Sequence, residues 1–126
     1  MTKAQFHFPD AQECAILLLL LARSGENRTK EITRFRLSEI TLKRLWHRNR
    51  ITDELLRDVH EWLARAGWAI FFAGGLYALV RVDVVENWVR LSSKKLAKEL
   101  EQVSSGTFDF EKHAYLIAKD QVDDDD

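Results

Sequence analysis

The residues of this sequence with the clearest capacity for chemistry are cations gathered in one stretch of the chain. Residues 23–50 contain nine lysines and arginines against three carboxylates, although the whole chain has a formal net charge of −1. Such clusters bind phosphates and other anions with an affinity that salt weakens. The basic stretch therefore predicts an anionic partner. The alternative interpretations are a solvated, partly salt-bridged face and a docking site for the chain's own acidic tail.

The acidic residues gather at the other end of the sequence. Residues 99–126 contain nine carboxylates against Lys112 and Lys119, and the sequence closes with Asp123–Asp126. We expect this tail to be solvated. It can serve for solubility, compete with an anionic ligand for the basic stretch, or act as a handle for a basic partner.

Catalytic and metal-binding groups are sparse by comparison. Cys14 is the only cysteine, which excludes an intramolecular disulfide and favours a reducing compartment such as the cytoplasm. Asp58 and Glu61 flank a histidine, but no nucleophile motif or glycine-rich loop accompanies them. We therefore expect no enzyme activity, no metal and no cofactor. The four histidines lack the spacing of metal ligands: they are His7, His47, His60 and His113.

The first expected element is a helix that opens at Asp10, whose carboxylate can cap the first turn while Glu13 completes a capping box. It should run to about Arg23 and stop at Ser24–Gly25. Its apolar run, Cys14–Ala22, is shorter than the roughly 20 residues that a membrane span needs. We therefore expect no membrane partner and a helix that is buried on nearly all sides.

The basic stretch is expected to form a short strand followed by a second helix. Phe35 and Leu37 alternate with polar residues, which favours a half-buried strand. Ser38 can then cap a helix that ends around Asn49–Arg50; Ile40 does not fit its apolar stripe. The apolar side of this helix carries Leu42, Leu45 and Trp46. Its opposite, basic side carries Lys43, Arg44, His47 and Arg48.

A third helix and a hairpin should come next. Thr52 can cap the helix, and a three-residue turn separates it from the second, which makes the two a helix-turn-helix candidate. Residues 68–73 and 76–82 are rich in β-branched and aromatic residues and flank Gly74–Gly75, as hairpin strands flank a tight turn. The buried stripe of the third helix is expected to contain Leu55, Val59, Trp62, Leu63 and Ala66.

The rest of the chain is expected to be helical. Asp83 and Glu86 can form a second capping box for a long helix with a kink at Ser92–Ser93. Ser104–Gly106 should break the chain, and Phe108–Lys119 should form one more short amphipathic helix. The apolar face of the long helix would carry Val85, Trp88, Val89, Ser92, Leu96, Leu100 and Val103.

In this order the elements resemble the winged helix-turn-helix family. The resemblance is carried by residues 52–68 (T-D-E-L-L-R-D-V-H-E-W-L-A-R-A-G-W), by the G-G hairpin tip and by L-Y-A-L in the return strand. It covers roughly residues 10–90 of the chain. We expect a mainly α fold with a small antiparallel β-sheet, of the α+β class. The winged-helix domain with its extra C-terminal helix would span 1–103, and an amphipathic segment with the acidic tail would span 104–126.

The resemblance implies double-stranded DNA as partner, with the third helix in the major groove, the hairpin as the wing, and the outer helices forming a homodimer. We therefore expect a cytoplasmic transcriptional regulator, or an accessory protein of replication or partition. The residues predicted to contact nucleic acid are Arg34, Arg36, Lys43, Arg44, His47, Arg48, Arg50, Thr52, Arg57, Gly74 and Gly75.

The charge of the third helix disagrees with that expectation. Asp53, Glu54 and Glu61 project outward with Arg57 as the only cation, although phosphates dominate nucleic-acid affinity. Acids near a helix start and an i, i+4 pair of Arg57 with Glu61 account for these charges structurally. The alternative function is a protein–protein interaction module, an adaptor or scaffold without specific DNA binding, with contacts at Glu54, Glu61 and Phe108–Lys119.

Overall fold

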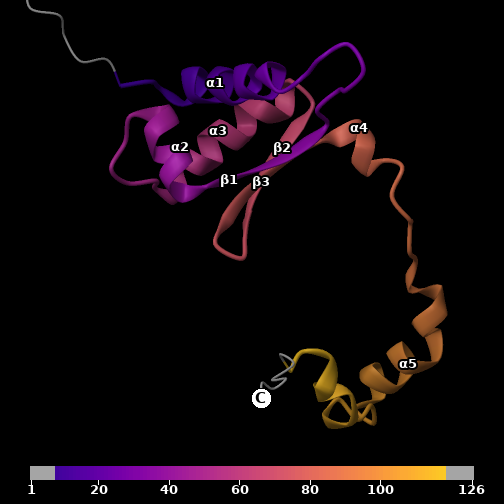
Figure 1. Cartoon of the computed structure of the whole chain (residues 1–126). Helices are drawn as coiled ribbons and strands as arrows, with labels where there is room; N and C mark the ends of the chain where they lie inside the picture. Colours follow the sequence, from indigo (N-terminus) through magenta and orange to yellow (C-terminus); the bar gives the residue numbers. More distant parts are fainter. Residues whose placement is uncertain (1–7, 119–126) are drawn as a thin grey trace, which may run out of the picture. The chain divides into compact units, whose positions relative to one another are not determined.

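The computed structural model describes residues 8–118, and the chain divides into two compact units between Trp88 and Val89. The sequence-based boundary, after residue 103, falls inside the second unit; Lys119 and Asp123–Asp126 lie outside the described residues. The first unit contains α1 (Ala11–Ser24), β1 (Arg34–Ser38), α2 (Glu39–Trp46), α3 (Asp53–Arg65), β2 (Trp68–Ala73), β3 (Leu76–Arg81) and α4 (Val82–Val85) (Figure 1). The second contains η1 (Ser93–Leu96), α5 (Ala97–Ser105) and η2 (Glu111–Leu116), where η marks a 3₁₀ helix.

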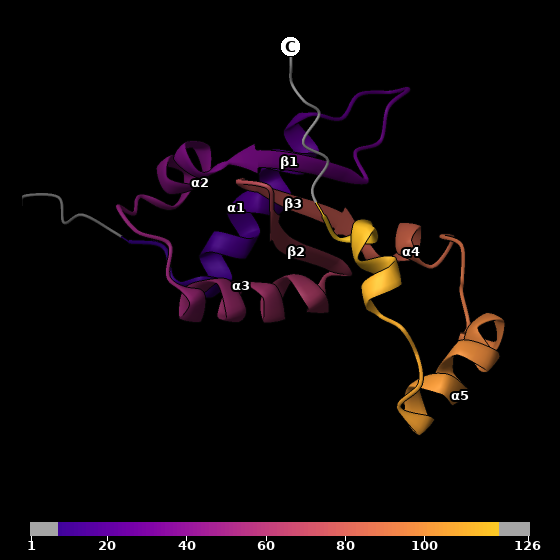
Figure 2. The same ribbon diagram turned by 90° about the horizontal axis from the view of Figure 1, so that it is seen from below.

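The predicted fold class is confirmed, because helices pack against a small antiparallel sheet in a winged-helix-like order. The strand order is β1-β3-β2, and the register pairs Leu37 with Tyr77 and Ile70 with Leu79. α3 runs beside β2, and α1 packs on α3 (Figure 2). In residues 8–118 no helix is both long and apolar enough to cross a membrane.

The hairpin between β2 and β3 is confirmed, and its turn explains the two glycines. Gly74 and Gly75 have φ values of 58° and 83°, in the left-handed region that costs glycine no steric energy. Two consecutive residues of this kind give a tight turn whose twist matches that of the flanking strands. The tip therefore consists of backbone with almost no side chain.

The start of α1 follows the sequence prediction in detail. The Asp10 carboxylate accepts a hydrogen bond from the Glu13 amide at 2.9 Å, and the Glu13 carboxylate accepts one from the Asp10 amide at 3.0 Å. The prediction of burial on nearly all sides is wrong, because Ile16 and Leu20 are 48% and 53% exposed. The buried residues of α1 are Cys14, Ala15, Leu18 and Ala22, and Leu17, Leu19 and Leu21 are partly buried against the core.

The caps of α2 and α3 also match the predictions. Ser38 Oγ accepts from the Thr41 amide, and Thr52 Oγ1 accepts from the Leu55 amide, both at 3.1 Å. Two details differ. α2 ends at Trp46 rather than around residues 49–50, because the next residue is left-handed. Ala66, expected in the buried stripe of α3, is exposed because it lies beyond the last turn.

The long helix expected from Asp83 is absent from the described structure. Instead of capping a helix, the Asp83 carboxylate accepts two hydrogen bonds from Arg81, both at 2.8 Å, and α4 ends at Val85. Arg81 also pairs with Glu31, and its hydrogen bonds lower the pKa of Asp83. The chain is then irregular up to η1. The break at residues 104–106 is confirmed, and within the described part of the expected helix 108–119 the structure has the 3₁₀ helix η2.

Candidate nucleic-acid interface

The end of α2 positions the most basic part of the first unit. His47 has φ 56°, and no other described non-glycine residue has a positive φ. Its amide donates to the Arg44 carbonyl at 3.3 Å, and the Arg48 amide donates to the Lys43 carbonyl at 3.0 Å. These two bonds satisfy carbonyls that the helix end leaves free and turn the chain sharply toward Asn49. The turn is thereby fixed by the backbone.

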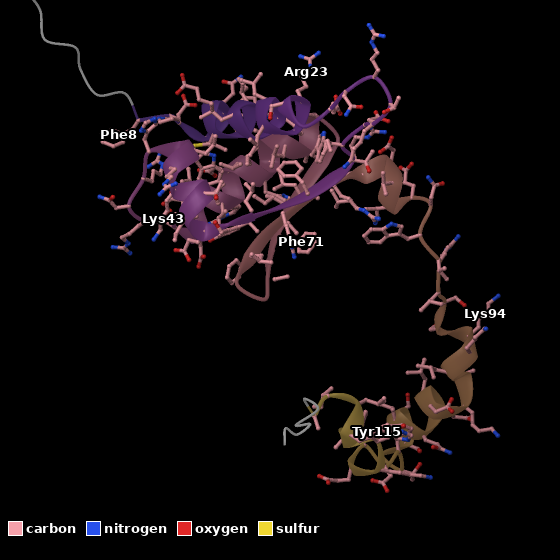
Figure 3. All side chains as sticks on the ribbon, viewed as in Figure 1. Phe8, Arg23, Lys43, Phe71, Lys94 and Tyr115 are labelled. Carbon is pink, nitrogen blue, oxygen red and sulfur yellow. The ribbon has the colours of Figure 1, made fainter. Side chains whose placement is uncertain are left out.

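A surface depression of about 710 Å³ lies beside this turn. Figure 3 shows Phe8 and Lys43, which both line it, at one end of the first unit, with Arg23 toward the other end. The side chains that line the depression are Phe8, Ile40, Lys43, Arg44, His47, Arg48 and Asn49. Four of the predicted binding residues are therefore brought together at one place.

The cations around the depression differ in whether a carboxylate of the chain already pairs with them. Lys43 Nζ lies 3.1 Å from the Glu39 carboxylate, one turn earlier on α2. Arg44 is exposed and makes no ion pair within the described part of the chain. Exposed pairs such as Lys43–Glu39 contribute little stability, so an incoming phosphate can compete for Lys43. Arg44 is the strongest candidate for a direct phosphate contact.

Arg48 departs from its predicted place on the exposed side of α2. It is half-buried, and its Nη2 donates to the Pro9 carbonyl at 2.7 Å, which ties the turn to the start of α1. Its Nε is buried without a hydrogen-bond partner among residues 8–118. Burial raises the pKa of the nearby Cys14 thiol to about 11, although the Arg48 charge acts in the opposite direction. Cys14 is therefore a protonated core residue at neutral pH.

The remaining predicted cations of this region lie just before or just after the α2 residues that line the depression in the sequence. Arg34 and Arg36 are exposed on β1, and they alternate with Phe35 and Leu37, which face the core. Arg50 is exposed in the turn before α3. Residues 34–50 contain six cations and one carboxylate, Glu39. We call the cations of this stretch the α2 surface: Arg34, Arg36, Lys43, Arg44, Arg48 and Arg50.

The other predicted contacts lie apart from the α2 surface. Arg57 lines a second depression, of about 230 Å³, between α3 and the hairpin. Thr52 is occupied as the cap of α3, and Gly74 and Gly75 form the hairpin tip. β2 and β3 carry a single cation, Arg81, which is already paired with two carboxylates. The α3 and hairpin face therefore offers a phosphate little beyond Arg57.

Sequence reasoning missed two apolar residues that shape the first depression. Ile40 is 65% exposed and Phe8 57% exposed, and both line it. The signal for Ile40 was present, because it is the apolar residue of α2 that does not fit the buried stripe. No pattern indicated Phe8, which reaches the site from outside the basic stretch. Both give the basic depression an apolar wall that can contact a sugar or base.

The described residues form no cluster of histidine, cysteine or carboxylate side chains able to hold a metal ion. The arrangement of charges and donors at the α2 surface is suited to binding anions. Comparisons of the chain with protein-family models, with curated proteins and with solved structures find no match.

Proposed function

We propose that this chain binds double-stranded DNA through the α2 surface, as a winged-helix-type regulator or an accessory protein of replication or partition. The observation that carries the proposal is the depression at which Lys43, Arg44, His47 and Arg48 meet. Glu39 is the only carboxylate between residues 34 and 50. Phosphate contacts supply most of the affinity of non-specific DNA binding, and arginine donors suit phosphate geometry.

The proposed DNA contact differs from the one that the resemblance implies, in which the third helix binds in the major groove. The exposed side of α3 carries Asp53, Glu54, Asp58 and Glu61, which would repel phosphates. β1 leads directly into α2, so its arginines lie within roughly 17 Å of the start of α2, at about 3.3 Å per residue. That span is about half a turn of duplex DNA. We infer that β1, α2 and the turn hold the DNA backbone.

The experiment is a salt titration of duplex binding by the full chain, read by fluorescence anisotropy. With about four phosphates neutralised, the slope of log K against log salt should be about −3.6. The expected result is binding in the micromolar range at low salt that weakens steeply as salt rises. An absence of binding to any duplex at low salt, or binding that salt leaves unchanged, would contradict the proposal.

A second candidate function, a protein-interaction module, is favoured by the face of α3 and the hairpin. Phe71 and Phe72 are 50% and 56% exposed there and line the second depression with Arg57 and Tyr77. α3 also carries the exposed carboxylates Glu54 and Glu61, and exposed aromatic and acidic side chains together suit a polypeptide with apolar and basic residues. Reversal of Glu54 and Glu61 to lysine should then abolish stoichiometric capture of one partner. Capture that survives this change would count against the candidate.

A further inference from the structure

The second unit leaves its apolar side chains uncovered. None of residues 89–118 is buried, and a groove of about 640 Å³ runs between α5 and η2. A segment of this size rarely forms a stable structure alone without a disulfide or a metal. The large apolar side chains exposed in this unit are Val89, Leu91, Leu96, Leu100, Val103, Phe110, Tyr115, Leu116 and Ile117.

The groove has one continuous apolar wall on α5 and its approach. Leu96, Leu100 and Val103 follow one another at spacings of four and three residues, which places them on one helix face. They are between 40% and 54% exposed, and all three line the groove. Phe108 and Leu116 line it from beyond the end of α5. The surface is suited to another apolar helix.

Charge along this unit points to the identity of that helix. The stretch 89–98 contains four cations and no carboxylate, whereas 99–118 contains four carboxylates against Lys112. Figure 3 shows one of the cations, Lys94, just before α5. A second copy in the same direction would place cations against cations. A second copy in the opposite direction would place each basic half against an acidic half.

We propose that a second copy of this chain covers the groove, in an antiparallel, two-fold pairing of residues 89–118. A two-fold interface must be complementary to itself, and this unit combines an apolar groove with charges of opposite sign along its length. Residues 119–126 contain a single apolar residue, Val122, so their composition does not suit them to fill the groove. The inference goes beyond the proposed function and does not depend on DNA binding.

The first test is the mass of the full chain by sedimentation, without DNA. The expected result is a concentration-dependent species of twice 14.7 kDa. Leu100→Glu should weaken its self-association at least about tenfold, because a charge would enter the apolar groove. The matched control is Leu20→Glu on α1, which is similarly exposed and should leave the dimer intact. A wild-type monomer at all concentrations, or equal loss in both variants, would overturn the proposal.

The second test uses charge reversal and leaves the apolar side chains of the groove unchanged. One variant carries Lys94→Glu, Lys95→Glu and Lys98→Glu, and the other carries Glu99→Lys, Glu101→Lys and Glu111→Lys. Apart from Arg90 and Lys112, the charges of residues 89–118 are then all negative in the first variant, and apart from Asp109 they are all positive in the second. Each variant alone should therefore be monomeric at low ionic strength, and an equimolar mixture should form a heterodimer. Dimers of either variant alone, or a mixture that stays monomeric, would exclude antiparallel pairing.

Discussion

Replacing Arg36, Arg44 and Arg50 together by alanine is expected to weaken duplex binding about 100-fold or more at 0.1 M salt. Each phosphate contact contributes about 0.9 to the salt slope, so three lost contacts should reduce the slope by about 2.7. All three side chains are exposed and make no ion pair within residues 8–118, so the fold should tolerate the change. The measurement is fluorescence anisotropy across a range of salt concentrations.

The matched control removes three other arginines and the same total charge. Arg23, Arg28 and Arg65 are exposed at the end of α1, in the following loop and at the end of α3, away from α2 (Figure 1). Arg65 also lies 4.3 Å from the Trp62 ring, so the control should cost slightly more stability than the test variant. A control that loses as much affinity as the test variant would show that net charge, rather than the α2 surface, carries binding.

Replacing Trp46 by alanine is expected to reduce the free energy of unfolding by about 3–5 kcal/mol. Trp46 is fully buried, and its indole N–H donates to the Cys14 carbonyl at 3.2 Å, which joins α2 to α1. Because domains are stable by only about 5–15 kcal/mol, this variant should be largely unfolded in mild urea. The measurement is urea denaturation followed by circular dichroism.

The control for that variant is another tryptophan of the first unit. Trp88 is 54% exposed, so Trp88→Ala should change the free energy of unfolding by about 0.5 kcal/mol or less. Similar losses from both substitutions would contradict the assignment of Trp46 as the contact that holds α2 in place. The DNA affinity of Trp46→Ala should fall with the folded fraction, because the α2 surface depends on the position of that helix.

Local signals predicted the first unit well. The capping residues Asp10, Ser38 and Thr52 set helix starts through hydrogen bonds within three residues, and Gly74–Gly75 fixes its turn through its own backbone. Such effects can be deduced from sequence because they involve near neighbours. The three-stranded sheet then follows from adding the alternating strand at Phe35.

Predictions failed where distant residues decide the structure. The capping box at Asp83 does not form because Arg81, which Glu31 binds from 50 residues away in the sequence, takes the carboxylate. The apolar stripe after Val85 indicates helical structure, but it does not show whether one continuous helix or several short ones form. In the same way, Arg48 has the pattern of an exposed cation until the chain folds back and offers it the Pro9 carbonyl.

The candidate site could be predicted only in part for a related reason. Sequence gives the charge of Arg34, Arg44 and Arg57, but not which of them share a surface. The structure puts Arg44 at the first depression and Arg57 at the second. Phe8 lies beside α2 because of the way α1 packs in the fold. No local sequence pattern predicts that packing.

The strand order has one more consequence for the arginines of β1. Since β3 lies in the centre of the sheet, β1 is an edge strand, with backbone donors and acceptors that another chain could extend into a larger sheet. Arg34 and Arg36 place two like charges along that edge, and a second β1 brought alongside would meet them. The same side chains that we propose for DNA binding should thus also oppose aggregation through the edge of the sheet.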